Sequence, residues 1–231
     1  MQIIESSVYG VRSAIYRLEP RRTGPAFTLF PMIHVGEPAY YDDISRRLAD
    51  CDLILYEGVR LRPPLGLLMP HEAVAGNPRL GLVSQYTMKT DHIQEKMVHA
   101  DVSAEEFRER WRSIPIRRQL ILYLTAPLML LYCRYLLTRR ILARHMGLML
   151  KKSRDEILYR DDDDPFRAII LGWRDEQLIT QIEKYRHSPT HADHNIAVLY
   201  GANHMRAVLR HLLNEADYRV ADGEWTVVFG T

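Results

Sequence analysis

Two β-rich runs near the N-terminus predict a hairpin. Residues 8–18 and 26–34 are rich in β-forming side chains, and Arg21–Pro25 between them contains glycine and proline. Turn-forming residues between two such runs are typical of antiparallel strands joined by a loop. The second run ends at His34, so we expect this histidine just beyond the end of a strand.

The next segment predicts a helix and then another strand. Tyr40, Ile44 and Leu48 recur at a spacing of four, which places them on one face of a short helix. Residues 52–59 form a short apolar run that ends in a single carboxylate, Glu57. Strand, helix and strand make a βαβ unit, so we expect parallel strands and a right-handed crossover.

The middle of the chain, from about residue 62 to 185, is predicted to be mainly helical. Ser103 and Glu106 have the spacing of a capping box. Residues 91–100 also fit a helix, which would bring His92 and His99 to one face as a solvated pair. The acidic run 161–164 fits a solvated turn before a helix, with a divalent-ion site as the less favoured alternative.

The run Leu120–Cys133 carries no charge and is flanked by arginines. A membrane-spanning helix needs about 20 apolar residues, and this run is shorter and contains Pro127. A buried helix or a homodimer interface is therefore favoured. Contact with a membrane surface through residues 120–144 is the alternative, because basic residues beside an apolar face attract anionic lipid.

The C-terminal part repeats the pattern of the N-terminal part. Asn195–Tyr200 is predicted as a strand, Gly201–His204 as a turn, and the residues from Met205 as an amphipathic helix, followed by closing strands at 218–220 and 225–229. Each end of the chain thus places a histidine just beyond a strand. Because ligands bind outside the carboxyl ends of strands in open α/β sheets, we expect His34, Glu57 and His204 to share one crevice.

Length and composition indicate a single domain, residues 1–231, and the predicted elements make it α/β, with a central mixed sheet and a helical insert. The chain is 47% hydrophobic and 26% charged, which is typical of a globular protein. Its net charge of +2 does not favour nucleic acid as a partner. Cys51 and Cys133 lack metal or redox spacing and are expected in the core. The first twenty residues lack a secretory pattern, so a cytoplasmic location is expected, with membrane-peripheral attachment as the variant.

Several segments resemble the Tiki/TraB/GumN superfamily, within a wider group that includes erythromycin esterases and haem-handling proteins. The similar segments are FPMIHVGEPAYYDDISRRLADCDLILYEGV, GLVSQY, ADVSAEEF, WRDEQLITQI and VLYGANHMRAVLRHLL. The last contains a GxxH motif. The first segment departs from the family pattern, because Pro31 stands where the family usually has glycine. The segment WRDEQLITQI departs less, with Asp175 where relatives often have asparagine. The hydrophobic insert is not matched.

The resemblance implies a metal-dependent hydrolase, peptidase-like or esterase-like, whose site contains His34, Glu57, Arg174 and His204. Imidazoles and a carboxylate suit Mn²⁺, Co²⁺ or Zn²⁺, so His34, Glu57 and His204 are the candidate ligands of a divalent ion. Glu57 is equally suited to be the general base, and Arg174 to orient it or to stabilise an oxyanion. The substrate would be a peptide or small molecule.

Two other functions remain open from the sequence. One is a non-catalytic protein that binds a peptide or small ligand in the same cleft, like TraB-type members linked to pheromone shutdown. The other is a membrane-surface interaction protein that uses residues 120–144. A weaker metal candidate is the loop cluster of His187, His191 and His194.

Overall fold

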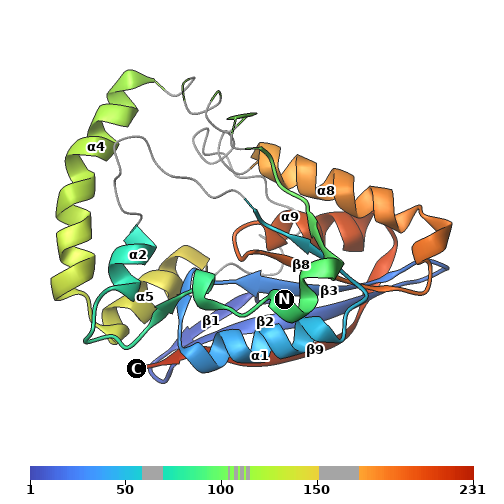
Figure 1. Ribbon diagram of the computed structural model, residues 1–231, viewed down its shortest axis with the longest axis horizontal. Coiled ribbons are helices and arrows are strands. Elements are labelled where there is room, and N and C mark those ends of the chain that lie inside the picture. Colours follow the sequence, from blue (N-terminus) through green and yellow to red (C-terminus); the bar gives the residue numbers. More distant parts are fainter. Residues whose placement is uncertain (59–69, 104, 107–108, 110–111, 113–114, 151–171) are drawn as a thin grey trace.

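A mixed β-sheet runs through the computed structural model (Figure 1), with strand order β1-β2-β3-β8-β5-β7 and with β9 also paired to β2. The structure describes residues 1–58, 70–103, 105–106, 109, 112, 115–150 and 172–231. The predicted α/β class and helical middle region are confirmed. The acidic run 161–164 lies outside the described residues.

One half of the sheet is antiparallel and is built around β2 (Gly10–Pro20). β3 (Ala26–Met32) forms the predicted hairpin with β2, and β1 (Ile4–Ser7) also runs antiparallel to it. The two predicted closing strands are instead one strand, β9 (Tyr218–Gly230). β9 pairs with β2 along the whole length of β2, with two register shifts of the kind that β-bulges produce.

The other half of the sheet is parallel. β8 (Asn195–Gly201) lies between β3 and β5 (Leu53–Tyr56), and β7 (Met97–His99) pairs with the far edge of β5. The predicted parallel βαβ unit is confirmed, although a third strand is inserted between its two strands.

The predicted helix over residues 91–100 is wrong. The segment forms a 3₁₀-helix, η2 (Asp91–Lys96), and then β7, so His92 and His99 share no helical face. Pairing with β5 supplies the backbone hydrogen bonds of β7, and this tertiary contact overrides the local helical pattern.

Helices cover both faces of the sheet (Figure 1). α1 (Pro38–Ala49) follows β3 on one face, whereas α8 (Trp173–Arg186) and α9 (Met205–Arg210) lie on the other. The chain moves from β3 past β8 to β5, and later returns to β8. Right-handed crossovers in opposite directions place their helices on opposite faces. A crevice is therefore expected at the carboxyl ends of β3, β8 and β5.

The remaining described elements are short or belong to the middle region and the end of α9. They are β4 (Val35–Gly36), α2 (Pro70–Ala75), β6 (Val83–Ser84), η1 (Gln85–Thr87), α4 (Ile116–Leu131), the π-helical η3 (Tyr132–Leu136), α5 (Arg139–Leu150), η5 (Pro189–His191) and the π-helical η6 (His211–Glu215). The predicted capping box is confirmed: the Ser103 N–H donates to Glu106 Oε2 at 2.8 Å, and the Glu106 N–H donates to Ser103 Oγ at 3.2 Å.

The core lies between the sheet and its covering helices. Phe27, Phe30 and Tyr200 of the central strands are 2% exposed or less. Cys51 and Cys133 are buried free thiols, as predicted. The core is thus centred on β3 and β8, the two strands that lead to the predicted histidines.

Most of the apolar run 120–133 lies outside this core, and only its last residues, among them Leu130 and Cys133, reach it. The run forms most of α4 and the start of η3, and its leucines are mostly exposed. Of the two favoured expectations, the buried helix is therefore wrong, whereas the homodimer interface stays a prediction, as does the alternative of a membrane contact. Within the part of the chain that the structure describes, Gln119–Leu136 is the one helix with the length and composition of a membrane span.

Candidate functional site

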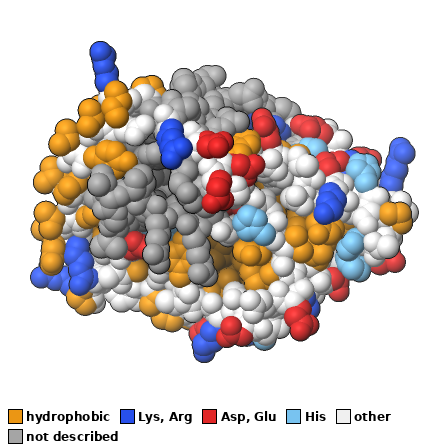
Figure 2. Space-filling model, turned by 45° about the horizontal axis from the view of Figure 1, so that its top comes forward, with side chains coloured by type: hydrophobic (Ala, Val, Ile, Leu, Met, Phe, Trp, Pro, Cys, Tyr) orange, Lys and Arg blue, Asp and Glu red, His pale blue; other side chains and the backbone are white. Residues whose placement is uncertain are grey.

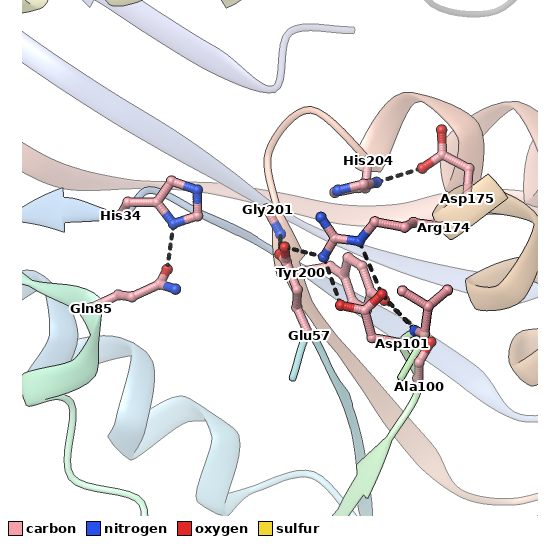
Figure 3. A network of polar contacts seen from close by, with 11 residues as sticks. His34, Glu57, Gln85, Ala100, Asp101, Arg174, Asp175, Tyr200, Gly201 and His204 are labelled. Atoms are coloured by element: carbon pink, nitrogen blue, oxygen red, sulfur yellow. Dashed lines mark hydrogen bonds and ion pairs between the residues drawn. The ribbon is translucent and has the colours of Figure 1, made fainter. Parts of the chain in front are cut away.

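The backbone around His34 is fixed from both sides. The Tyr41 hydroxyl of α1 donates to the carbonyl of Ile33 at 2.8 Å, and the Gln85 N–H donates to the carbonyl of His34 at 2.9 Å. The imidazole itself is exposed, with Nδ1 3.1 Å from Gln85 Oε1 (Figure 3). The end of β3 therefore holds the residue firmly while its ring remains accessible.

Pro31 fits into β3 without an unpaired backbone group. The antiparallel pairing of β3 with β2 ends at Leu29, opposite Tyr16, so no N–H is needed from the proline toward β2. The Pro31 carbonyl instead accepts hydrogen bonds from Ser13 Oγ at 2.9 Å and the Tyr40 hydroxyl at 3.2 Å. Proline at this position is thus accommodated within the strand.

A buried ion-pair network connects Glu57, Arg174 and Asp101 (Figure 3). Arg174 Nη2 donates to Glu57 Oε1 at 2.5 Å and to Asp101 Oδ2 at 2.6 Å, and Arg174 Nε donates to Asp101 Oδ1 at 3.0 Å. The side chains of Arg174 and Asp101 are 9% and 0% exposed. The guanidinium binds Asp101 in a bidentate manner, with two parallel hydrogen bonds, a geometry that lysine cannot reproduce.

The second carboxylate oxygen of Glu57 accepts a hydrogen bond from the backbone at the end of β8. Glu57 Oε2 accepts a hydrogen bond from the Gly201 N–H at 2.7 Å. Burial by itself would raise the pKa of Glu57, but the charges of Arg174 and His204 and the hydrogen bonds from Arg174 and Gly201 hold it below its usual value. Glu57 is therefore an ionised carboxylate with a fixed orientation.

The same opposition of burial and pairing acts on the second carboxylate of the network. Desolvation would raise the pKa of Asp101, but the hydrogen bonds and charge of Arg174 lower it overall. One cation therefore compensates two carboxylates in a buried environment.

Gly201, the first residue of the GANH element, stands between Glu57 and His204. A Cβ atom at Gly201 would lie 3.0 Å from Glu57 Oε2 and 3.6 Å from His204 Cδ2. Glycine at this position leaves space for the carboxylate to reach the backbone N–H. The glycine of the GxxH motif thus has a packing reason that involves Glu57.

His204 is 4% exposed in its side chain and pairs with Asp175 of α8. Its Nδ1 lies 2.6 Å from Asp175 Oδ1, and its other ring nitrogen faces away from Asp175 (Figure 3). Burial raises the pKa of Asp175, and the charges of His204 and Arg174 only partly offset this effect. Asp175 therefore orients the imidazole ring in the way that a carboxylate orients a functional histidine.

A cavity of about 530 Å³ lies at the ends of the strands and connects these groups. Its lining has a polar part, made by His34, Glu57, His71, Glu72, Gln85 and Arg174. It also has an apolar part that includes Met32, Tyr56, Tyr86, Met88, Met97 and Leu199. Three of the four predicted site residues thus line one cavity, whereas His204 is buried beside it, on the other side of Gly201.

His71 is a further imidazole in this cavity. Its ring centroid lies 4.9 Å from that of His34 and 6.3 Å from that of Tyr86. Burial and the neighbouring His34 lower the pKa of His71 to about 4. His71 is therefore neutral near pH 7 and able to act as a hydrogen-bond partner for a ligand.

The residues predicted to hold a divalent ion do not form a ligand cluster as they stand. His34 contacts Gln85, His204 contacts Asp175, and both oxygens of Glu57 accept hydrogen bonds. No three His, Cys, Asp or Glu side chains in the described ranges are arranged to hold a metal ion. The expected Mn²⁺, Co²⁺ or Zn²⁺ site stays a prediction. His187, His191 and His194, all within the described residues, likewise form no ligand cluster.

Sequence reasoning missed Asp101 and His71. Asp101 follows β7, so the rule that identified Glu57 would have found it if residues 97–99 had been recognised as a strand. His71 lies on α2, whose position next to β4 follows from tertiary packing alone. Asp101 lies in ADVSAEEF and Gln85 in GLVSQY, two of the segments on which the expected resemblance rests.

Comparison with known proteins adds no assignment to this geometry: no family model matches the chain, and no curated protein and no solved structure matches it either. The class that the fold and site define is an α/β protein with a charged cavity at the carboxyl ends of parallel strands.

Proposed function

We propose that this protein is a hydrolase that binds a peptide, ester or amide in the cavity beside Glu57. The observation that carries the proposal is the fixed, ionised Glu57 carboxylate in a cavity that also contains imidazoles. The resemblance of the flanking segments to Tiki/TraB proteins points to the same class of reaction. Fold alone would not support it, because α/β sheets host many unrelated activities.

In this proposal Glu57 accepts a proton from a water molecule that attacks the substrate carbonyl. Arg174 is a positioning residue, because its donors already bind Glu57 and Asp101. In the same proposal the bond between the carbonyl carbon and the leaving group then breaks, and His34, exposed at the cavity, gives the leaving group a proton that Glu57 later returns through solvent. No step is assigned to a metal ion.

The apolar part of the cavity supports a substrate with an uncharged side chain or acyl group. Methionine side chains are flexible and polarizable, so a lining with Met32, Met88 and Met97 adapts to differently shaped apolar groups. The substrate would therefore place its carbonyl near Glu57 and its apolar group against these methionines.

The test is hydrolysis of fluorogenic peptides, anilides and p-nitrophenyl esters by the full chain, before and after chelation and with Mn²⁺, Co²⁺ or Zn²⁺ added back. We expect Glu57→Gln to lower kcat by about 100-fold or more, because it removes a general base and keeps the side-chain shape. Glu95→Gln is the matched control, since Glu95 is exposed on η2. Absence of hydrolysis under every condition, or full activity of Glu57→Gln, would refute the proposal.

A non-catalytic binding protein is the second candidate function. The observation that favours it is that the polar atoms of this site already have hydrogen-bond partners within the protein, as in a structural network. Arg174 donates to Glu57 and Asp101, and Glu57 also accepts from the Gly201 N–H. Binding of peptides to the cavity, measured by thermal shift, would then persist in Glu57→Gln and after chelation while no product forms.

A further inference from the structure

Along the sequence, basic residues are concentrated before and after the apolar helix α4. Residues 110–154 contain eleven Lys and Arg and no Asp or Glu, whereas the rest of the chain has twenty basic residues against twenty-nine acidic ones. A net charge of +2 therefore conceals a strongly basic segment in an otherwise acidic protein. Such a segment complements a negatively charged partner.

The apolar side chains of α4 are exposed over more than one stripe of the helix. Leu120, Leu124 and Leu128 are 52%, 74% and 70% exposed, and Met129 is 50% exposed. Leu124 and Met129 are five residues apart and so point about 140° away from each other. In Figure 2 hydrophobic side chains gather along the edge formed by α4, with Lys and Arg side chains near its ends.

The chain after α4 is anchored in the fold. Asn77 Nδ2 donates to the carbonyl of Cys133 at 3.2 Å, and α5 packs against β1 and β2. Arg139 at the start of α5 binds Glu37 at 2.7 Å. The exposed leucines of α4 contribute little to this anchoring, so their surface is available to a partner.

The topology argues against a membrane-spanning α4. Val102 before α4 and Cys133 after it are both buried in the same fold. A spanning α4 would force residues 103–115 to cross the bilayer as well, and these include Glu105, Glu106 and Glu109. Charged residues in the hydrocarbon core are too costly for such a crossing.

We propose that α4 and the first turns of α5 dock on the surface of an anionic lipid bilayer. The leucines of α4 enter the boundary of headgroups and acyl chains, and Arg140 and Arg144, both exposed on α5, contact the headgroups. This inference does not depend on the proposed hydrolase activity.

The charge distribution favours lipid over a second copy of the chain. A two-fold symmetric dimer places the same patch on both sides of its interface, so two basic segments without acidic residues would repel each other. The broad apolar surface also exceeds the single stripe that a helix presents to a protein groove.

The experiment is flotation of the full chain with vesicles of about two parts phosphatidylcholine to one part phosphatidylserine, compared with phosphatidylcholine alone. We expect binding to the mixed vesicles, much weaker binding to the neutral ones, and release by high salt. The double substitution Leu124→Glu and Leu128→Glu should abolish binding. The double substitution Arg140→Glu and Arg144→Glu should weaken it by at least about tenfold.

Val227→Glu is the matched control, because Val227 is 54% exposed on β9, away from α4, and this variant should bind normally. Circular dichroism checks that all variants are folded. The proposal is overturned if the folded wild type does not bind the mixed vesicles, or if the Arg140 and Arg144 variant binds as well as the wild type. It is also overturned if light scattering shows a dimer that the leucine substitutions dissociate while vesicle binding is absent.

Discussion

Replacement of Arg174 by methionine should destabilise the protein more than any other single loss of an ion pair described above. Methionine keeps most of the side-chain volume but removes the cation that compensates Glu57 and Asp101, and the Asp101 side chain is completely buried. Loss of one partner from a buried ion pair costs about 3–5 kcal/mol, because the remaining charge has no partner. We expect a loss of this size in the free energy of unfolding at pH 7.

The loss should shrink as the pH falls. In the wild type the pKa values of Glu57 and Asp101 are lowered by Arg174, so their contribution to stability is present above their unfolded pKa values and is lost as pH falls through the folded ones. Without Arg174, burial and mutual repulsion raise both folded pKa values, and the variant becomes less stable as the pH rises through them. The difference between the two proteins should therefore be largest near neutral pH.

Urea denaturation at about pH 7 and about pH 4.5 measures this difference, because the two values lie above and near the ordinary pKa of a carboxyl group. The matched control is Arg186→Met, which removes a partly exposed pair with Glu183 and should cost at most about 1 kcal/mol. Adding Asp101→Asn to Arg174→Met should recover part of the loss, since it removes the uncompensated charge. A loss below about 1 kcal/mol at pH 7, equal to that of the control, would refute the buried network.

Two further predictions concern single positions. Gly201→Ala should lower hydrolytic activity by about tenfold or more while changing unfolding by about 1 kcal/mol or less, because the new Cβ would lie 3.0 Å from Glu57 Oε2 and displace the carboxylate. Gly172→Ala, where a Cβ meets nothing within 4 Å, is its control, and equal activity of both variants would contradict the packing argument. Hydrogen bonds from Arg186, together with the hydrogen bond and charge of His211, lower the pKa of Glu183 to about 2, although burial acts in the opposite direction. Glu183 therefore stabilises the protein above its unfolded pKa and loses this effect as pH falls toward 2. Glu183→Gln should flatten the acid side of the stability profile measured by urea denaturation, and an unchanged profile would contradict this assignment.

The elements at both ends of the chain could be predicted because their signals are local. The hairpin, the helix after His34 and the strand before Gly201 follow from side-chain periodicity and turn residues, and they correspond to β2–β3, α1 and β8. The juxtaposition of Glu57 with Arg174 was also expected, although it rested on the resemblance of LYEG and GWRDE to a family motif. The structure brings these two residues into direct contact.

The sequence by itself determined which strands lead to His34, Glu57 and His204, because hydrophobic periodicity and turn chemistry act over a few residues. Only the tertiary structure decided that Asp101 shares Arg174 with Glu57, since β7 exists through its pairing with β5. It likewise decided that α4 is exposed, because burial depends on which surfaces meet in three dimensions and an apolar sequence does not specify them.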